Sequence, residues 1–335
     1  MKRTMKIKLA ALLLAILTAV MSTAASAYVT KYGLQIGDLN EDEEVNEIDY
    51  VCLARYLAGW DVDIALEAAD IDYDGGVDEQ DAIMFARKNA GWDVASKKEK
   101  LAEELKGKTF CFVGDSITCG VGATSNANRF STKVSKRMEA LEQNIAISGS
   151  TICTGGDYVS DMVNFDRIKK ADVIFVAMGV NDFNASMNKE MYGPGEKGLA
   201  EKDSTTFYGA LETACEFFTE YKKTTKPNLR VIFLTPLISS PEACTGGPYT
   251  YDNEAKNKFG LTRRDYCEII LDVAGEYGFE AIDTNLVSGI YYNSQEDETV
   301  SKYLNDGLHP NDAGYDKLTE VILSYLLGDI PNAEK

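Results

Sequence analysis

The chain has 335 residues, of which 53 are Asp or Glu and 34 are Lys or Arg, giving a net charge of −19. Such an acidic balance argues against nucleic acid and anionic lipid as partners. The length is sufficient for two domains, one of them large enough to enclose a full hydrophobic core.

Residues 1–27 have the features of a secretory signal peptide. Four basic residues precede an apolar run at 9–20, and the small residues at 25–27 fit a cleavage site. The apolar run is too short for a comfortable membrane span, and no other stretch is apolar enough to cross a membrane. We therefore expect a secreted, soluble protein, whose net charge changes from −19 to −23 when the four basic residues leave.

The segment between Asp38 and Asp81 is very acidic and contains a repeat. It holds sixteen Asp or Glu residues and a single basic residue, Arg55. Residues 49–60 match residues 81–92 at an offset of 32, and both tryptophans of the chain lie at the same repeat position. A duplication of this length is typical of two copies of one supersecondary element that pack on each other.

An acidic loop with regular spacing precedes each repeated segment. Oxygen-bearing side chains at loop positions 1, 3, 5, 9 and 12 are the ligands that Ca²⁺ prefers. The predicted ligands are Asp38, Asn40, Asp42, Asn46 and Asp49 in the first loop, and Asp70, Asp72, Asp74, Asp78 and Asp81 in the second. Position 6, where a tight turn favours Gly, is Gly75 in the second loop and Glu43 in the first. The alternative is a solvated acidic loop without metal.

These two loops, with the segments 53–57 and 85–87 that follow them, resemble a dockerin over residues 33–93. The resemblance implies a small all-α module that binds structural Ca²⁺ and attaches an enzyme to a cohesin on a cellulosome scaffold. Loop positions 10 and 11, which contribute to partner choice in dockerins, are Glu47-Ile48 in one copy and Glu79-Gln80 in the other. The type of cohesin therefore stays open.

Residues 94–107 form a charged connector in which Leu101 and Leu105 are four positions apart, which predicts a short helix. From residue 108 strands alternate with helices, which predicts a parallel sheet covered on both faces, a three-layer α/β/α domain. The predicted strands are 109–113, 144–149, 171–178, 230–234 and 279–283, and the predicted helices are 130–141, with Val134, Met138 and Leu141 on one face, 207–222, 263–277 and 312–327.

Candidate site residues follow the ends of these strands. Ser116 follows the first strand, Gly149 lies at the end of the second and Asn181 follows the third. Asp306 and the single histidine of the chain, His309, precede the last helix. A serine needs a base to become a nucleophile, and acyl transfer also needs an orienting acid and oxyanion donors. Each motif alone also fits an ordinary turn, and a lone histidine is more often structural than catalytic.

Taken together, the stretches at 114–116 (GDS), 149, 179–182 (GVND) and 306–310 (DGLHP) resemble the SGNH (GDSL-type) hydrolases over residues 108–328. The resemblance implies a flavodoxin-like domain with Ser116 as nucleophile, His309 as base and Asp306 as the acid that orients it. It further implies an oxyanion hole of the Ser116 and Gly149 N–H groups and the Asn181 amide, with no metal in catalysis.

The two resemblances together imply a secreted, cellulosome-associated serine esterase. The first hypothesis is removal of acetyl groups from xylan or pectin. One alternative is a lipid or aryl esterase or a thioesterase of the same family, tethered by the dockerin. A second alternative is a non-catalytic module that binds polysaccharide or scaffold. Tyr192, Tyr249 and Tyr251 in the long loops 183–204 and 239–258 either stack on sugar rings or pack the loops.

The seven cysteines support no functional assignment. Six lie in the larger domain without metal-binding spacing, and an odd number leaves at least one free. Cys52 aligns with Met84 in the repeat, which favours a core position.

Overall fold

The structure, a computed structural model, describes residues 35–71, 76–92, 97–153, 165–239, 255–290 and 302–328. The chain divides into two compact units, one that extends to Glu104 and one that runs from Leu105 to Leu326. The predicted signal peptide lies outside the described residues. In the described ranges, no helix is long and apolar enough to cross a membrane.

The small unit contains two matching helices, α2 (Glu47–Leu57) and α4 (Glu79–Asn89), together with the short α3 (Leu66–Ala69). The bounds of α2 and α4 reproduce the 32-residue offset of the repeat. Each helix begins at a capping box, formed by Asn46 with Asp49 and by Asp78 with Asp81. The acids at loop position 12 are thus also helix-capping residues.

The two repeats enclose one common core. Leu53 of α2 and Phe85 of α4 are buried, and the ring of Tyr50 lies 6.0 Å from that of Phe85. Cys52 and Met84 are partly buried against this core, as their alignment in the repeat predicts. Two copies that cannot bury their apolar faces separately therefore do so against each other.

Helix α5 (Lys97–Leu105) confirms the helix predicted from the spacing of Leu101 and Leu105. After it begins a sheet of five parallel strands in the order β2-β1-β3-β4-β5. The strands are β1 (Thr109–Gly114), β2 (Leu141–Asn144), β3 (Val173–Ala177), β4 (Arg230–Leu234) and β5 (Glu280–Ile282).

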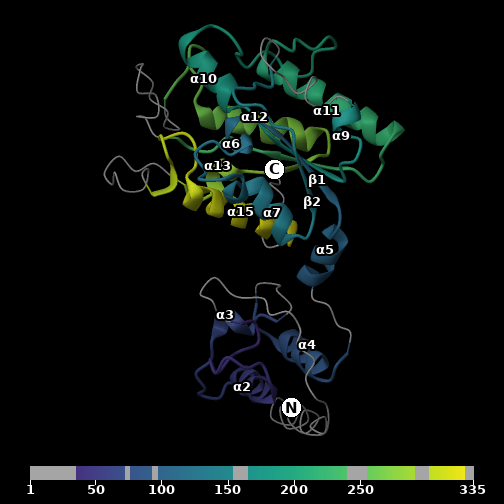
Figure 1. The fold of residues 1–335 in the computed structure, drawn as a ribbon, viewed down its shortest axis with the longest axis vertical. Helices are drawn as coiled ribbons and strands as arrows, with labels where there is room; N and C mark the ends of the chain where they lie inside the picture. Colours follow the sequence, from purple (N-terminus) through teal and green to yellow (C-terminus); the bar gives the residue numbers. More distant parts are fainter. Residues whose placement is uncertain are drawn as a thin grey trace. The chain divides into compact units, whose positions relative to one another are not determined.

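Helices cover both faces of this sheet, which confirms the predicted three-layer α/β/α fold. Helices α10 (Val180–Asn188), α11 (Phe207–Thr224) and α12 (Arg263–Glu276) lie on one side, and α7 (Phe130–Arg137) and α15 (Asp312–Leu326) lie on the other (Figure 1). Short helical segments complete the unit: α6 (Ser116–Cys119), η1 (Asn126–Asn128), α9 (Phe165–Ile168) and α13 (Thr284–Val287).

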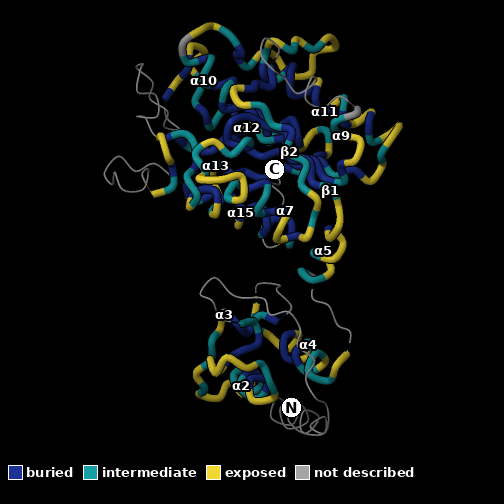
Figure 2. The backbone as a smooth tube through the Cα atoms, viewed as in Figure 1, coloured by how far each residue is buried: buried dark blue, intermediate teal, exposed yellow. Residues whose placement is uncertain are grey.

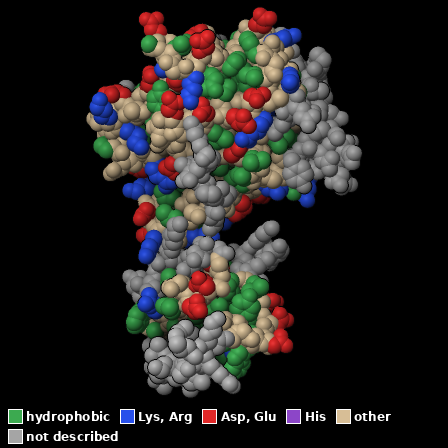
Figure 3. Space-filling view, turned by 180° about the vertical axis from the view of Figure 1, so that it is seen from behind, with side chains coloured by type: hydrophobic (Ala, Val, Ile, Leu, Met, Phe, Trp, Pro, Cys, Tyr) green, Lys and Arg blue, Asp and Glu red, His purple; other side chains and the backbone are tan. Residues whose placement is uncertain are grey.

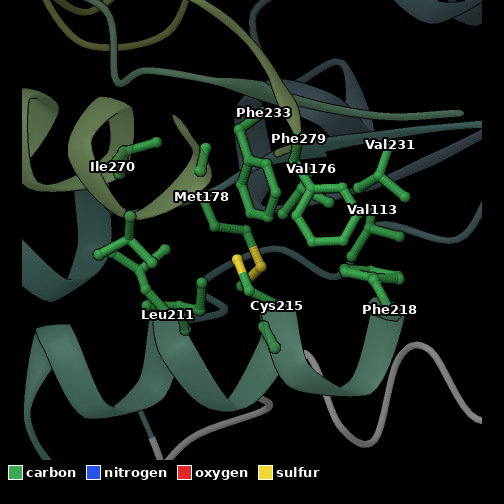
Figure 4. Packing of buried hydrophobic residues seen from close by; sticks show 14 of the residues in the cluster. Val113, Val176, Met178, Leu211, Cys215, Phe218, Val231, Phe233, Ile270 and Phe279 are labelled. Carbon is green, nitrogen blue, oxygen red and sulfur yellow. The ribbon is translucent and has the colours of Figure 1, made fainter. Parts of the chain in front are cut away.

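Successive side chains of each strand point to opposite faces of the sheet, and each face packs against its own layer of helices. Strand β1 directs Val113 toward α11, where Leu211, Cys215 and Phe218 form an apolar stripe with i, i+4, i+7 spacing (Figure 4). Its Phe112 is on the other face, where its ring stacks on Phe175 of β3 at 4.8 Å. Figure 2 shows the resulting buried layer through the sheet. Burial on both faces explains why the inner strands β1, β3 and β4 are nearly continuous apolar runs, whereas the edge strand β2 is polar and partly exposed.

Two predictions near residue 141 are wrong. The helix predicted over 130–141 ends at Arg137, and Leu141 is instead the first residue of β2, with 63% of its surface exposed. The chain leaves the helix through Glu139, whose φ is +50°. The strand predicted over 144–149 is also displaced, since β2 ends at Asn144 and residues 145–149 lie outside any strand. The apolar helical spacing simply continues by chance through this turn.

The long loop predicted over 183–204 is also partly wrong, since its first six residues belong to α10. Of the loop predicted over 239–258, the structure describes only residue 239 and residues 255–258, so Tyr249 and Tyr251 lie outside the described residues.

On the face drawn in Figure 3, the Lys and Arg side chains of the larger unit are interspersed with Asp and Glu rather than gathered into one basic area.

Candidate active site

Ser116 lies where β1 turns sharply into the short helix α6. A Cβ atom at Gly114 would overlap the Thr118 hydroxyl and lie 2.8 Å from the carbonyl oxygen of Ala177 on β3, so only glycine fits this turn. The Asp115 carboxylate caps α6 by accepting the Ile117 N–H at 2.9 Å. These contacts fix the backbone on both sides of the serine.

Tyr315 of α15 holds the far end of this turn. Its hydroxyl lies 2.8 Å from the carbonyl oxygen of Ile117 and 2.9 Å from that of Val121. The side chain is fully buried. Both carbonyls belong to the end of α6 and the segment after it, so a residue far along the chain positions the loop that carries Ser116.

His309 lies between Ser116 and Asp306. Its Nε2 is 2.8 Å from Ser116 Oγ, and its Nδ1 is 2.7 Å from Asp306 Oδ2. The other carboxylate oxygen of Asp306 accepts the backbone N–H groups of His309, at 2.7 Å, and of Leu308, at 3.0 Å. The structure thus brings together all three residues that the sequence predicts for the catalytic relay.

The charge on Asp306 determines the tautomer of the imidazole. Although partial burial opposes ionisation, the hydrogen bonds from His309 and Leu308 hold the pKa of Asp306 below its usual range. An ionised carboxylate only accepts hydrogen bonds, so Nδ1 must carry the proton and Nε2 is left as an acceptor for the Ser116 hydroxyl. The arrangement is that of a nucleophile with its base.

The three predicted oxyanion donors have different surroundings. Gly149 has a φ of +87° and open space in the direction of a Cβ, so its backbone is accessible to a ligand. Within the described ranges, the N–H groups of Ser116 and Gly149 have no hydrogen-bond acceptor. The Asn181 amide, at the start of α10, donates to the Ser150 carbonyl oxygen at 2.9 Å.

Two buried acids that the sequence analysis does not single out adjoin these residues. Asp115 precedes Ser116 and Asp182 follows Asn181, and their exposed fractions are 2% and 0%. Burial, opposed by the Ile117 N–H and reinforced by the negative charge of Asp182, raises the pKa of Asp115 to about 7. Burial likewise raises the pKa of Asp182, against the hydrogen bonds that it accepts from Cys153 and Ile152. The signal available in the sequence is only their adjacency to site residues.

Residues 112–317 match the family model of the GDSL-like Lipase/Acylhydrolase family. The chain belongs to this family. Within this GDSL-type hydrolase domain, the matched residues include the five candidate site positions from Ser116 to His309. Among curated proteins, no match was found. Residues 36–88 match the dockerin type I domain, so the small unit is a dockerin.

Solved structures share the fold of the hydrolase domain. A protein from Lactobacillus plantarum has a TM-score of 0.55 and 26% identity, and the match covers 68% of this chain and 99% of that chain. Another crystal structure has a TM-score of 0.55 and 28% identity over 68% of this chain and 99% of its own. A variant of an acetyl-xylooligosaccharide esterase from Geobacillus Stearmophilus has a TM-score of 0.43 and 17% identity, covering 66% of this chain and 94% of that chain. A likeness at this last level does not define a substrate.

The first acidic loop of the dockerin is held by bonds to its own backbone. Asp38 accepts the N–H groups of Asp42 and Glu43, both at 3.1 Å, and Asp49 accepts those of Leu39, at 2.8 Å, and Asn46, at 2.9 Å. Glu43 has a φ of +69°, the left-handed conformation that explains the preference for Gly at this position.

The donor set of this loop suits Ca²⁺ because it consists of carboxylate and amide oxygens. The carboxylates of Asp38 and Asp49 are buried, and neither has a cationic side-chain partner among the described residues. Among those residues, no three His, Cys, Asp or Glu side chains converge closely enough to form a complete metal site. In the second loop, Asp72, Asp74 and Gly75 lie outside the described residues, while Asp81 accepts the Ile71 N–H as its counterpart in the first loop does.

Tyr192 packs in the core rather than on a sugar-binding surface. It is 7% exposed and belongs to the main apolar cluster of the hydrolase domain. Its backbone carbonyl accepts the Tyr266 hydroxyl at 2.7 Å. The packing alternative for this tyrosine is therefore correct. The six cysteines in the described ranges are free thiols, and Cys244 lies outside them.

Proposed function

We propose that this protein is a secreted, cellulosome-associated serine esterase that removes acetyl groups from plant cell-wall polysaccharide. The observation that carries the proposal is the continuous contact from Asp306 through His309 to Ser116, with 2.7 Å and 2.8 Å between successive atoms. Such a chain is suited to proton transfer from a hydroxyl, and esters are the substrates of the family.

In the first step, Ser116 Oγ attacks the ester carbonyl carbon while His309 Nε2 takes the hydroxyl proton. Asp306 stabilises the imidazolium that forms, and His309 returns the proton to the departing sugar hydroxyl. In the second step, water gives a proton to His309 and attacks the acyl carbon. His309 then returns that proton to Ser116 Oγ as its bond to the acyl carbon breaks, which releases acetate and restores Ser116. His309 therefore acts as base and acid in turn.

The tetrahedral intermediate of each step carries a negative oxygen that needs hydrogen-bond donors. The N–H groups of Ser116 and Gly149 and the side-chain amide of Asn181 are the proposed donors. Their support is the accessible backbone at Gly149 and the lack of an acceptor for the two N–H groups within the described ranges. Donors fixed by the fold before the reaction need no reorganisation when the charge develops.

The dockerin supports the choice of substrate and place of action. A dockerin tethers its enzyme to a cohesin, so the partner of the small unit is a cohesin-bearing scaffold protein. The substrate is then the plant cell-wall polysaccharide on which the enzymes of such a scaffold act. Acetylated xylan and pectin are esters of this kind. Residues 1–27 would supply the export that such an attachment requires. Ca²⁺ in the two acidic loops would stabilise the dockerin and take no part in ester hydrolysis.

The test is acetate release from acetylated xylan by the wild type and by Ser116→Ala. Ser135→Ala is a matched control, because Ser135 is also buried and its hydroxyl has no hydrogen-bond partner in the described part of the chain. We expect release by the wild type and Ser135→Ala, and none by Ser116→Ala. Hydrolysis of an aryl acetate without release from xylan would reject acetylated xylan as the substrate, and absence of both activities would reject the esterase.

A further inference from the structure

Asp182 is the most deeply buried acid next to the candidate site. It is the third residue of α10, and its exposed fraction is 0%. Its neighbour Asn181 is the proposed oxyanion donor, but the Asp182 side chain faces the protein interior. A carboxylate is costly to bury unless several donors bind it, so its partners indicate what it does.

Those partners are consecutive backbone groups of one segment. Asp182 Oδ1 accepts the N–H of Ile152 at 3.1 Å and that of Cys153 at 2.9 Å, and Oδ2 also lies 3.1 Å from the Ile152 nitrogen. Both residues are buried, with exposed fractions of 4% and 0%. Water therefore cannot replace the carboxylate, and its loss would leave two buried donors without acceptors.

The same segment carries another proposed oxyanion donor, Gly149. The start of α10 binds the segment at two points, since Asn181 donates to the Ser150 carbonyl oxygen at 2.9 Å while Asp182 accepts the N–H groups of Ile152 and Cys153. Adjacent residues of α10 thus bind a carbonyl and two N–H groups of a single short loop. The contacts couple the position of the Gly149 N–H to the position of the Asn181 amide.

We propose that Asp182 is a positioning residue, which holds the 149–153 segment so that the Gly149 N–H and the Asn181 amide act on the same oxyanion. The proposal rests on the esterase function argued above. Asp182 does not touch the substrate. Its contribution is to keep two donors from different strand ends at a fixed separation, and donors displaced by even a fraction of an ångström stabilise the transition state less.

The test variant is Asp182→Asn, which preserves size but replaces the charged carboxylate with a neutral amide, so that a single, weaker acceptor oxygen is left for the two N–H groups. We expect kcat for an aryl acetate to fall at least about tenfold, toward the 100-fold to 1,000-fold range of a lost oxyanion donor, with little change in KM. The matched control is Asp172→Asn, because Asp172 also accepts a backbone N–H, that of Thr109 at 2.8 Å, but at the opposite end of the sheet. Asp172→Asn should keep its kcat.

A double variant separates positioning from general damage. If Asp182 acts through the oxyanion hole, Asp182→Asn should cost less kcat in an Asn181→Ala background than in the wild type, because the hole is already impaired. A loss that multiplies fully in the double variant, or an unchanged kcat in Asp182→Asn, would overturn the proposal.

Hydrogen exchange tests the contact without depending on activity. In the full-length wild type, the amides of Ile152 and Cys153 should be protected like those of the central strands, and Asp182→Asn should expose them while Asp172→Asn does not. Rapid exchange in the wild type, or unchanged protection in Asp182→Asn, would refute the anchoring role even if the variant folds poorly. A wild type that shows this protection but has no Ser116-dependent esterase activity would instead reject the proposed function.

Discussion

Asp115 makes the stability of the hydrolase domain depend on pH in a direction that can be worked out. Its carboxyl is buried beside α6 and close enough to Asp182 to be affected by its charge, and its pKa is raised from 3.8 to about 7. Between these values the folded protein keeps a proton that the unfolded chain releases. The stabilisation is therefore complete below pH 3.8 and is lost as the pH rises through about 7.

The magnitude follows from proton linkage. Each pH unit in this interval costs about 1.4 kcal/mol of unfolding free energy, so the whole shift corresponds to about 4 kcal/mol. Asp115→Asn removes the titration and keeps a side chain that caps helices well. From pH 5 to pH 7, the stability of Asp115→Asn relative to the wild type should increase by about 2 kcal/mol, because the folded carboxyl is already half ionised at pH 7. It should change little above that range.

The assay is urea unfolding of both proteins from pH 5 to pH 8 at constant ionic strength, followed by far-UV ellipticity. Trp60 and Trp92 are the two tryptophans of the chain and both lie in the dockerin, so their fluorescence reports its unfolding separately. Asp172→Asn is the control, since hydrogen bonds and Lys226 hold the pKa of Asp172 low despite partial burial. A flat difference between Asp115→Asn and the wild type would refute a protonated, buried Asp115.

Three further predictions concern the relay, the turn and the metal. Asp306→Asn should lower kcat by about 10³-fold to 10⁴-fold. The backbone N–H donors need the amide oxygen, so the NH₂ group faces Nδ1 and imposes the wrong imidazole tautomer. A variant that keeps a tenth of the wild-type kcat in steady-state kinetics would contradict this prediction. Tyr315→Phe should destabilise the hydrolase domain by about 1–3 kcal/mol in urea unfolding, since the buried Ile117 carbonyl and the partly buried Val121 carbonyl lose the one hydroxyl proton that they share. An unchanged midpoint would contradict the contacts. Chelation of Ca²⁺ should lower the unfolding temperature reported by tryptophan fluorescence, and added Ca²⁺ should restore that temperature. The rate of aryl acetate hydrolysis should not change. A loss of esterase activity on chelation would contradict a role for the metal in the dockerin alone.

The sequence predicted the sheet well where apolar runs have clear ends. Strand β4 has the predicted bounds, and β3 lies within the predicted range, because buried parallel strands of β-branched and aromatic residues contrast with their polar flanks. The error at Leu141 arose where no Gly or Pro marks the end of α7 and the apolar spacing continues into β2. A turn made through Glu139 with a positive φ leaves no compositional signal.

The candidate site was predictable as a set of residues but not as a geometry. Ser116, Asp306 and His309 are recognisable from their motifs, and their contacts follow from strands that end at one edge of the sheet. The burial of Asp182 was not predictable, because an acid beside a strand end reads equally well as a solvated helix cap. Its role depends on a segment some thirty residues earlier, and only the packed structure brings the two together.

The arrangement explains why two of the site motifs contain an acid beside the proposed reactive group. In the first motif Asp115 precedes Ser116, and in the third Asp182 follows Asn181. Adjacent residues at a helix start project in different directions, so one can face the substrate while its neighbour faces the interior. The inward acids accept backbone N–H groups, those of Ile117 and of the 152–153 segment, and so orient the outward groups. Their burial costs stability, as the raised pKa of Asp115 implies. On the proposal made above, this cost accompanies the fixed placement of the proposed oxyanion donors. Asp115→Asn and Asp182→Asn should accordingly differ, because the neutral oxygen of Asn can still accept the one N–H group at Asp115 but holds the two N–H groups at Asp182 less firmly than a charged carboxylate does.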